Sequence, residues 1–330
     1  MKMRKLIATV LSAMLVLLSL TACQSQNSGK NESSSQTESE TSADIETTAE
    51  STSPVEISDL YNFEKYESSD VFNISKVKLN EKLENTCVSY QFTYYSDGLR
   101  IRGYISIPYS LATTQKPGKC VMYNHGGNRG YGKLEDHTTA VVCALCDRIV
   151  VGSQYRGGGG SEGKDEFGGD DLNDVIKLID LCEKQFSFVD MDDFCVIGAS
   201  RGGVMTYPAA RQDKRIKRII ASSAVSDLFE SYESRDDMKS VLEETIGCTP
   251  QEKPEEYKKR SAIYWADEIK IPVLIFHSKN DPQVSYKQAE ELYAKLKDTT
   301  DCTLITYDDD LHCNIREEDY PKIKKFLNSK

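Results

Sequence analysis

A serine held between glycines is the feature of this chain that most directly indicates chemistry. The motif Gly198-Ala199-Ser200-Arg201-Gly202 follows an apolar run at residues 194–197 and precedes an expected helix. A serine at such a sharp strand-to-helix turn is exposed for nucleophilic attack, and glycines two residues away on either side avoid collisions with neighbouring backbone. The sequence therefore predicts a nucleophile elbow with Ser200 as the nucleophile.

A second stretch, Gly159-Gly160-Ser161-Glu162-Gly163, matches the same pattern. No strand leads directly into it and no helix pattern follows it, so we interpret Ser161 as a loop residue. The overlapping spacing Gly158-x-Gly160-x-x-Gly163 also fits a dinucleotide-binding turn, but it opens no helix and acidic residues follow it. We therefore expect no nucleotide cofactor.

A serine hydroxyl is a poor nucleophile at neutral pH and needs a positioned base. Of the four histidines, only His277 and His312 follow Ser200, as the chain order Ser, acid, His requires in an α/β-hydrolase. His277 directly ends an expected strand and is interpreted as a packing residue, whereas His312 lies in a loop before the last helix and is the predicted base. Asp281, in the loop after the strand at residues 271–276, is the predicted acid that orients His312. The alternative is that Asp281, which precedes a proline, is only a turn residue.

An oxyanion hole is expected at the loop Asn124-His125-Gly126-Gly127, because glycines there let backbone N–H groups approach a substrate. The N–H of Gly127, or of Gly126, would act together with the N–H of Arg201. The alternative is a plain glycine turn. His125 and Arg156 are candidates for lining the substrate pocket.

The cysteines predict neither a metal site nor an assignable disulfide. Nine cysteines follow Cys23, and most lie inside apolar strand or helix patterns, as small buried hydrophobic residues do. Cys143 and Cys146 have a redox-type spacing, but they lie in mid-helix without a second cysteine pair or a nearby histidine. We expect the protein to work without a metal or cofactor.

Alternating strand and helix patterns predict an α/β-hydrolase fold, with a mostly parallel central sheet and helices on both faces. An Asp97-Gly98 turn predicts a hairpin between residues 88–95 and 99–107. A polar stretch at residues 227–266 is expected to be a small helical insert. In such sheets, sites form at the carboxyl ends of the strands.

The N-terminus predicts export. Residues 1–22 combine a positive start with an apolar run, and Leu20-Thr21-Ala22-Cys23 resembles a bacterial lipobox, which implies lipid attachment to Cys23. An ordinary secretory signal or an uncleaved anchor is the alternative. Residues 23–56 are rich in Ser, Thr and Glu and are expected to be a disordered tether before a hydrolase domain at residues 57–330. The predicted location is the outer face of a bacterial cell membrane. The formal net charge of −11 and the lack of a basic stripe argue against nucleic-acid binding.

From about residue 88 onward, the chain resembles the catalytic domain of the prolyl oligopeptidase family. The family-like stretches are His125-Gly126-Gly127, Tyr155-Arg156-Gly157-Gly158-Gly159-Gly160, Phe167-Gly168-Gly169-Asp170-Asp171, Gly198-Ala199-Ser200-Arg201-Gly202-Gly203, Tyr257-Lys258-Lys259-Arg260-Ser261-Ala262 and Ile271-Pro272-Val273-Leu274-Ile275-Phe276-His277-Ser278. The resemblance implies serine peptidase activity. The family's peptidases usually carry a β-propeller before this domain, whereas here a tether and a brief leader precede it, which puts exopeptidase specificity in doubt.

The predicted function is acyl transfer from a small-molecule or short-peptide substrate, through a Ser200–His312–Asp281 triad and an acyl-enzyme. The family resemblance favours a peptide bond as the target. A carboxylesterase acting on small or sugar esters is the alternative enzyme. A lipid-anchored binding protein without activity is the alternative from another class, because it would explain Cys23 and the tether equally well.

Overall fold

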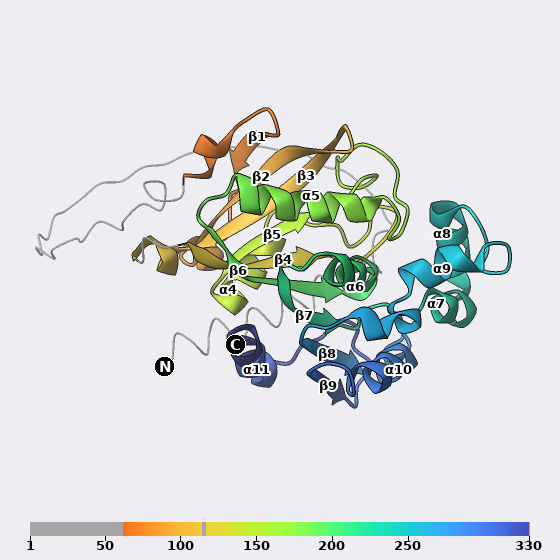
Figure 1. Cartoon of the computed structure of the whole chain (residues 1–330). Coiled ribbons are helices and arrows are strands. Elements are labelled where there is room, and N and C mark those ends of the chain that lie inside the picture. The colour runs from red at the N-terminus through yellow and green to blue at the C-terminus, as the bar shows by residue number, and fades with distance from the viewer. Residues whose placement is uncertain (1–61, 114–116, 330) are drawn as a thin grey trace, which may run out of the picture.

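One mixed sheet organises the protein. The computed structural model describes residues 62–113 and 117–329, so the expected signal segment, Cys23 and the tether lie outside the described residues. Within the described part, the sheet has nine strands in the order β1-β2-β3-β5-β4-β6-β7-β8-β9. Neighbours from β5 to β9 in this order are parallel, and the remaining pairs are antiparallel (Figure 1). The strands are β1 (Val71–Lys76), β2 (Cys87–Ser96), β3 (Leu99–Pro108), β4 (Gly118–Asn124), β5 (Ile149–Ser153), β6 (Val189–Ala199), β7 (Ile216–Ser222), β8 (Val273–Ser278) and β9 (Cys302–Tyr307).

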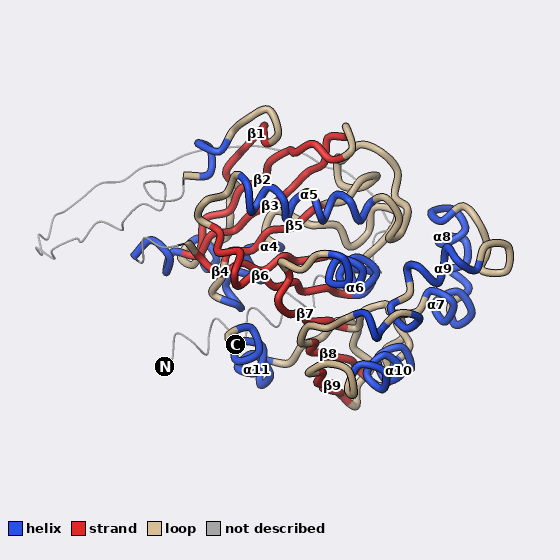
Figure 2. The backbone as a smooth tube through the Cα atoms, viewed as in Figure 1, coloured by secondary structure: helices blue, strands red, loops and turns tan. Residues whose placement is uncertain are grey.

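Helices cover both faces of the sheet, as the sequence predicts (Figure 2). On one face α5 packs against β5 and β6, α6 against β6 and β7, and α10 against β8 and β9, whereas α4 packs on the other face against β2, β3 and β5 and contacts α11. The α-helices are α3 (Glu81–Glu84), α4 (Thr138–Cys146), α5 (Asp171–Lys184), α6 (Gly203–Gln212), α7 (Leu228–Ser234), α8 (Asp236–Ile246), α9 (Pro254–Arg260), α10 (Tyr286–Leu296) and α11 (Tyr320–Leu327). The predicted insert contains α7, α8 and α9.

The central strands are buried on both faces. In β6, Phe194 and Val196 belong to one apolar cluster, and Cys195 and Ile197 belong to another on the opposite face. Successive side chains of a strand point to opposite faces, so a strand covered on both sides must be apolar at each position. The continuous apolar run before Ser200 therefore reflects the central position of β6.

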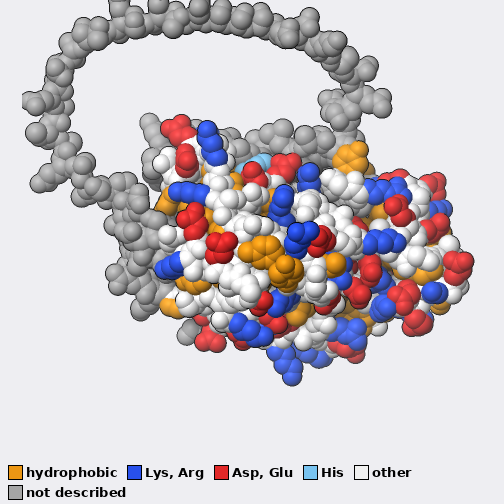
Figure 3. All heavy atoms as spheres, turned by 90° about the horizontal axis from the view of Figure 1, so that it is seen from above, with side chains coloured by type: hydrophobic (Ala, Val, Ile, Leu, Met, Phe, Trp, Pro, Cys, Tyr) orange, Lys and Arg blue, Asp and Glu red, His pale blue; other side chains and the backbone are white. Residues whose placement is uncertain are grey.

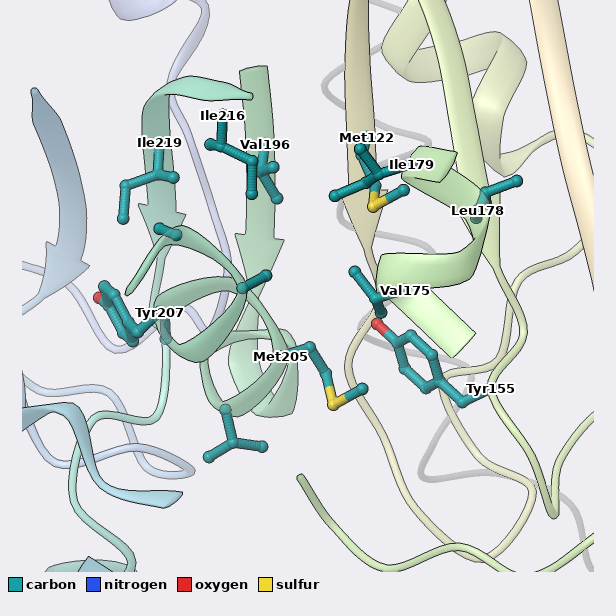
Figure 4. Packing of buried hydrophobic residues seen from close by; sticks show 14 of the residues in the cluster. Met122, Tyr155, Val175, Leu178, Ile179, Val196, Met205, Tyr207, Ile216 and Ile219 are labelled. Atoms are coloured by element: carbon teal, nitrogen blue, oxygen red, sulfur yellow. The ribbon is translucent and has the colours of Figure 1, made fainter. Parts of the chain in front are cut away.

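The cluster on the face of α5 and α6 joins several elements in one layer. Figure 4 shows Ile179 of α5 beside Met122 of β4, and Ile216 of β7 beside Val196 of β6. All four side chains belong to the same buried cluster. This packing fixes α5 and α6 against the strands whose ends carry the site.

The Asp97-Gly98 hairpin is confirmed. Strands β2 and β3 pair antiparallel from Cys87 to Ser96, and the two turn residues have φ angles of 50° and 79°. Two consecutive residues with positive φ match the twist of a tight hairpin, and Asp-Gly adopts them at low cost.

Two elements differ from the sequence expectation. The first strand named from the sequence begins at residue 88, yet β1 precedes it and pairs with β2, with a register irregularity between Phe72 and Ser75. The last helix is split, because a 3₁₀ turn at Glu317–Asp319 precedes α11.

On the face seen in Figure 3, Lys and Arg side chains lie among Asp and Glu side chains.

The buried cluster predicts a contrast between two leucines. Leu178 of α5 is fully buried and Leu311 is 42% exposed. We expect Leu178→Ala to lower the free energy of unfolding by about 2–5 kcal/mol because it leaves a cavity. Leu311→Ala should change it by less than about 0.5 kcal/mol. Urea unfolding of both variants measures the difference, and equal losses would contradict the assigned core.

Candidate active site

Two glycines after Ser200 have no room for a side chain. A Cβ atom on Gly202 would lie 2.1 Å from the carbonyl oxygen of Asn124, at the end of β4. A Cβ atom on Gly203 would lie 2.4 Å from the carbonyl oxygen of Val225, in the loop after β7. Because these neighbours are backbone atoms, they cannot rotate away. The start of α6 is therefore pressed between the ends of the two strands that flank β6.

Ser200 is held in a strained backbone conformation. Its φ of 54° lies in the left-handed region, which is uncommon for residues other than glycine. Gly126 packs directly against it, since a Cβ atom on Gly126 would lie 2.9 Å from Ser200 Cβ and 3.5 Å from Ser200 Oγ. The elbow thus faces the loop that the sequence predicts to form the oxyanion hole.

Asp281 and His312 are brought together from the loops after β8 and β9. The two oxygens of the Asp281 carboxylate lie 2.8 Å and 3.0 Å from His312 Nδ1. Because a carboxylate accepts, Nδ1 carries the hydrogen and Nε2 is the nitrogen left for proton transfer. This is the relation between acid and base that the sequence predicts.

Asp281 is also fixed by its own loop, so its roles as turn residue and as partner of His312 coexist. Its Oδ1 accepts hydrogen bonds from the backbone N–H groups of Gln283 (2.8 Å) and Val284 (3.1 Å). Burial acts to raise the pKa of Asp281, but hydrogen bonds from His312 and Ser223 outweigh it and the pKa is lowered. The carboxylate therefore stays ionised. The sequence analysis missed Ser223, although it follows β7 at the same edge of the sheet.

His312 Nε2 contacts a thiol. Cys313 Sγ lies 3.4 Å from this nitrogen, and Ser200 Oγ makes no hydrogen bond to any residue in the described ranges. Burial of the ring opposes protonation, but the neighbouring Cys313 sulfur and the Asp281 carboxylate outweigh it and raise the pKa of His312 to about 10. The sequence analysis did not identify Cys313 as part of the site.

The backbone of the predicted oxyanion loop is closely packed. Gly127 has a φ of 82°, and a Cβ atom there would lie 1.9 Å from the carbonyl oxygen of Tyr131. The N–H of Arg201 lies in the first turn of the helix after the elbow, where amides have no intrahelical acceptor. The loop and the helix start thus both border Ser200, as an oxyanion hole requires.

The side chain of His125 holds this loop through hydrogen bonds to its backbone. Its Nδ1 lies 2.7 Å from the carbonyl oxygen of Gly126 and 3.1 Å from that of Gly132, so Nδ1 carries the hydrogen. The ring stacks on Tyr155 with 4.2 Å between ring centroids. Burial, followed by the charge of Arg201, lowers the pKa of His125 to about 4. His125 is therefore neutral and shapes the loop.

The side chain of Arg201 belongs to a buried charge cluster. Its guanidinium lies 2.6 Å from Asp165 and 2.7 Å from Asp171. It also lies over the rings of Tyr155 and Phe167. Burial raises the pKa of Asp171, an effect that the charge of Arg201 opposes. Arg201 thus joins the elbow to the glycine-rich loop that follows β5.

Arg156 also forms ion pairs with two aspartates. Its guanidinium lies 2.8 Å from the fully buried Asp174 of α5 and 2.7 Å from Asp97 in the hairpin turn. These two partners engage Nε and Nη2 of the guanidinium. The structure therefore gives the Arg156 side chain a structural contact, although the residue borders a cavity.

A cavity of about 240 Å³ lies beside the oxyanion loop. Both pocket candidates, His125 and Arg156, line it, together with Gly127 and Arg201. Glu244 and Thr245 of the insert close one side. The insert is tied to the oxyanion loop by an ion pair of 2.5 Å between Arg129 and Glu244.

Comparison with known proteins agrees with this geometry. The model of the prolyl oligopeptidase family matches residues 135–328. The chain belongs to the prolyl oligopeptidase family of serine peptidases. It is 31% identical over 211 residues to the uncharacterized peptidase YtmA of Bacillus subtilis, covering 63% of this chain and 79% of YtmA. It is 26% identical over 208 residues to the uncharacterized peptidase YuxL of the same organism, covering 61% of this chain and 31% of YuxL.

Solved structures share the fold. Pyrococcus horikoshii acylaminoacyl peptidase superposes with a TM-score of 0.64 at 22% identity, over 74% of this chain and 42% of that protein. The esterase Pf2001 of Pyrococcus furiosus superposes with a TM-score of 0.57 at 16% identity, over 76% of this chain and 95% of that protein. This chain therefore spans less than half of the archaeal peptidase and nearly all of the esterase.

The other residues singled out in the sequence of this prolyl oligopeptidase family member, Ser161, His277 and the cysteines, make structural contacts or are buried. Ser161 lies in a loop, where its Oγ accepts a hydrogen bond of 3.0 Å from the N–H of Arg102. His277 Nε2 lies 2.8 Å from the carbonyl oxygen of Val284, in keeping with a packing role. All nine cysteines in the described ranges are free, and seven of them are buried. No cluster of three or more potential metal ligands occurs within those ranges.

The crowding at the elbow predicts that substitution of one glycine slows the labelling of Ser200, whereas substitution of another does not. We expect Gly202→Ala to displace Ser200 and to slow its reaction with a fluorophosphonate by about 100-fold, the scale expected for a shift of about 1 Å. Gly158→Ala is the matched control, because a Cβ atom there would meet only the Gln154 carbonyl oxygen, at 3.5 Å. Labelling rates of the two variants make the comparison. An unimpaired Gly202→Ala would contradict the packing.

The buried charge cluster predicts a stability effect. We expect Arg201→Met to lower the free energy of unfolding by about 3–5 kcal/mol, because Asp171 would remain buried without its partner. The control is Arg100→Met, which breaks an exposed ion pair with Glu162 and should cost about 0–1 kcal/mol. Urea unfolding measures both, and a small effect at Arg201 would rule out a structural role for the cluster.

Proposed function

We propose that this family member cleaves peptide bonds by acyl transfer. Ser200 is the nucleophile, His312 is the base, and Asp281 orients His312. The observation that carries the proposal is the 2.8 Å hydrogen bond between Asp281 and His312 Nδ1, in loops at the same sheet edge as the strained elbow of Ser200. A paired acid and base beside a strained serine is the arrangement that acyl transfer needs.

In the proposed reaction, Nε2 of His312 takes the proton of Ser200 as Oγ attacks the substrate carbonyl. The N–H groups of Arg201 and of Gly127 or Gly126 stabilise the oxyanion. His312 then protonates the leaving amine, an acyl-enzyme forms, and water releases it. Asp281 stays ionised and stabilises the charged imidazole. No step requires a metal or cofactor.

The proposed substrate is a short peptide. Family membership supports an amide target, and a related acylaminoacyl peptidase has been solved in complex with Z-Gly-Gly-Phe-chloromethyl ketone. A carboxylesterase acting on small esters is the second candidate, because the Pyrococcus furiosus esterase matches this chain over 95% of its own length.

We further propose that the enzyme is exported and held at the outer face of a bacterial membrane by a lipid on Cys23. The proposal rests on the sequence of residues 1–23. Among the described residues, no helix combines the length and the apolar character that crossing a membrane requires.

Fluorophosphonate labelling of the full-length chain tests the chemistry. We expect one modified serine, Ser200, identified by mass spectrometry. Labelling should be lost in Ser200→Ala and His312→Ala, with turnover lowered by about 10⁴- to 10⁶-fold. Ser161→Ala is the matched control and should be labelled as the unmodified chain is.

A panel of peptide amides and esters then separates the candidates. Hydrolysis of short peptide amides by the enzyme that has not been treated with the fluorophosphonate would support the peptidase. Hydrolysis of esters alone would favour the carboxylesterase. A folded protein that is neither labelled nor active would favour a binding lipoprotein in which the triad has no catalytic role.

A further inference from the structure

The residue after the predicted base has an unusual conformation and position. Cys313 has a φ of 54°, in the left-handed region that favours glycine. Its N–H donates to Ser223 Oγ at 3.1 Å, and its thiol has one hydrogen to donate either to the carbonyl oxygen of Ser222 or to His312 Nε2, each 3.4 Å from Sγ. The contacts with Ser223 and Ser222 are with the end of β7. They turn the thiol toward the imidazole of His312.

We propose that the Cys313 thiol competes with Ser200 for Nε2 of His312 and thereby limits the supply of free base. This inference rests on the proposed catalytic function of Ser200 and His312. The thiol lies 3.4 Å from Nε2, whereas Ser200 Oγ makes no hydrogen bond within the described ranges. Because Nδ1 is committed to Asp281, Nε2 is the one nitrogen available to either group. Cys313 must move aside before Ser200 can transfer its proton.

The competition affects proton uptake by His312. A sulfur that shares a hydrogen with Nε2 stabilises the protonated imidazole, and a protonated imidazole cannot accept the proton of Ser200. Removing the sulfur removes one of the influences that raise the pKa of His312, while the bond to Asp281 remains. The base should therefore become free at lower pH.

Few other ionisable groups face this pair. His277 lies 3.7 Å from Asp281, and burial lowers its pKa, so it remains neutral. Tyr123 of β4 faces the sulfur, and burial raises its pKa. In the loop that carries His312, Asp309 is paired with Arg316 at 2.8 Å. Within the described part, Asp281 and Cys313 are thus the groups that set the charge of His312.

The pH dependence of Ser200 labelling by a fluorophosphonate tests the proposal on the full-length chain. We expect Cys313→Ala to move the midpoint of the rate profile down by about one pH unit, which corresponds to about tenfold faster labelling below the midpoint. Cys313→Ser should give an intermediate midpoint, because a hydroxyl can contact Nε2 but is a weaker acid than a thiol. Cys313→Gly fits the left-handed backbone and repeats the test if the alanine variant folds poorly.

Alkylation by iodoacetamide gives a second readout. The Cys313 sulfur bonds to the methylene carbon, the carbon–iodine bond breaks with loss of iodide, and the thiol proton passes to His312 Nε2 and then to solvent. The adduct would lie between His312 and Ser200, so we expect labelling of Ser200 to be lost. Cys313→Ala should resist this loss. Cys302→Ala replaces the other half-buried cysteine of the described ranges, and this variant should lose Ser200 labelling after alkylation as the wild type does.

The outcomes separate this inference from the proposed function. If wild type and Cys313→Ala share the same rate profile, and iodoacetamide leaves Ser200 labelling intact, the inference is wrong while the triad stands. If wild type is not labelled at Ser200, or His312→Ala is labelled at the normal rate, the proposed function is wrong.

Discussion

The site depends on how little space the backbone leaves around Ser200. Gly202 lies against the carbonyl group of Asn124, the last residue of β4, and Gly203 lies against that of Val225, in the loop after β7. The turn can form only when β6 lies between those two strands, and it forces Ser200 into the left-handed region. The strain at Ser200 is thus maintained by the packing of the central sheet, together with the hydrogen bond that the N–H of Val225 donates to the Ser200 carbonyl oxygen.

The parallel arrangement then determines which residues meet. The strands β4, β6, β7, β8 and β9 end at the same edge of the sheet, so the loops that follow them are neighbours although they are distant in sequence. These loops carry Gly127, Ser200, Ser223, Asp281 and His312. A change in strand order would separate the acid from the base without altering any of these side chains.

The sequence was sufficient for features that depend on local spacing or chain order. The elbow, the Asp97-Gly98 turn and the position of His312 after the last strand follow from rules of that kind. Strand β1 was missed because most of its side chains are exposed or half-buried, so it has no apolar pattern, and because it pairs irregularly with β2 at the sheet edge. The contact of Cys313 with His312 was missed because it depends on a backbone angle, and no neighbouring residue type signals a left-handed cysteine.

The contacts of Arg156 and Arg201 could not be predicted from the sequence, because their partners come from distant parts of the chain. The loop between β5 and α5 is rich in glycine, so it has few side chains to bury and cannot be held by apolar packing alone. Buried arginines paired with Asp165, Asp171 and Asp174 hold it instead. Arg201 therefore links two parts of the structure: its backbone lies in the turn that begins at Ser200, while its side chain fixes the loop that borders the cavity.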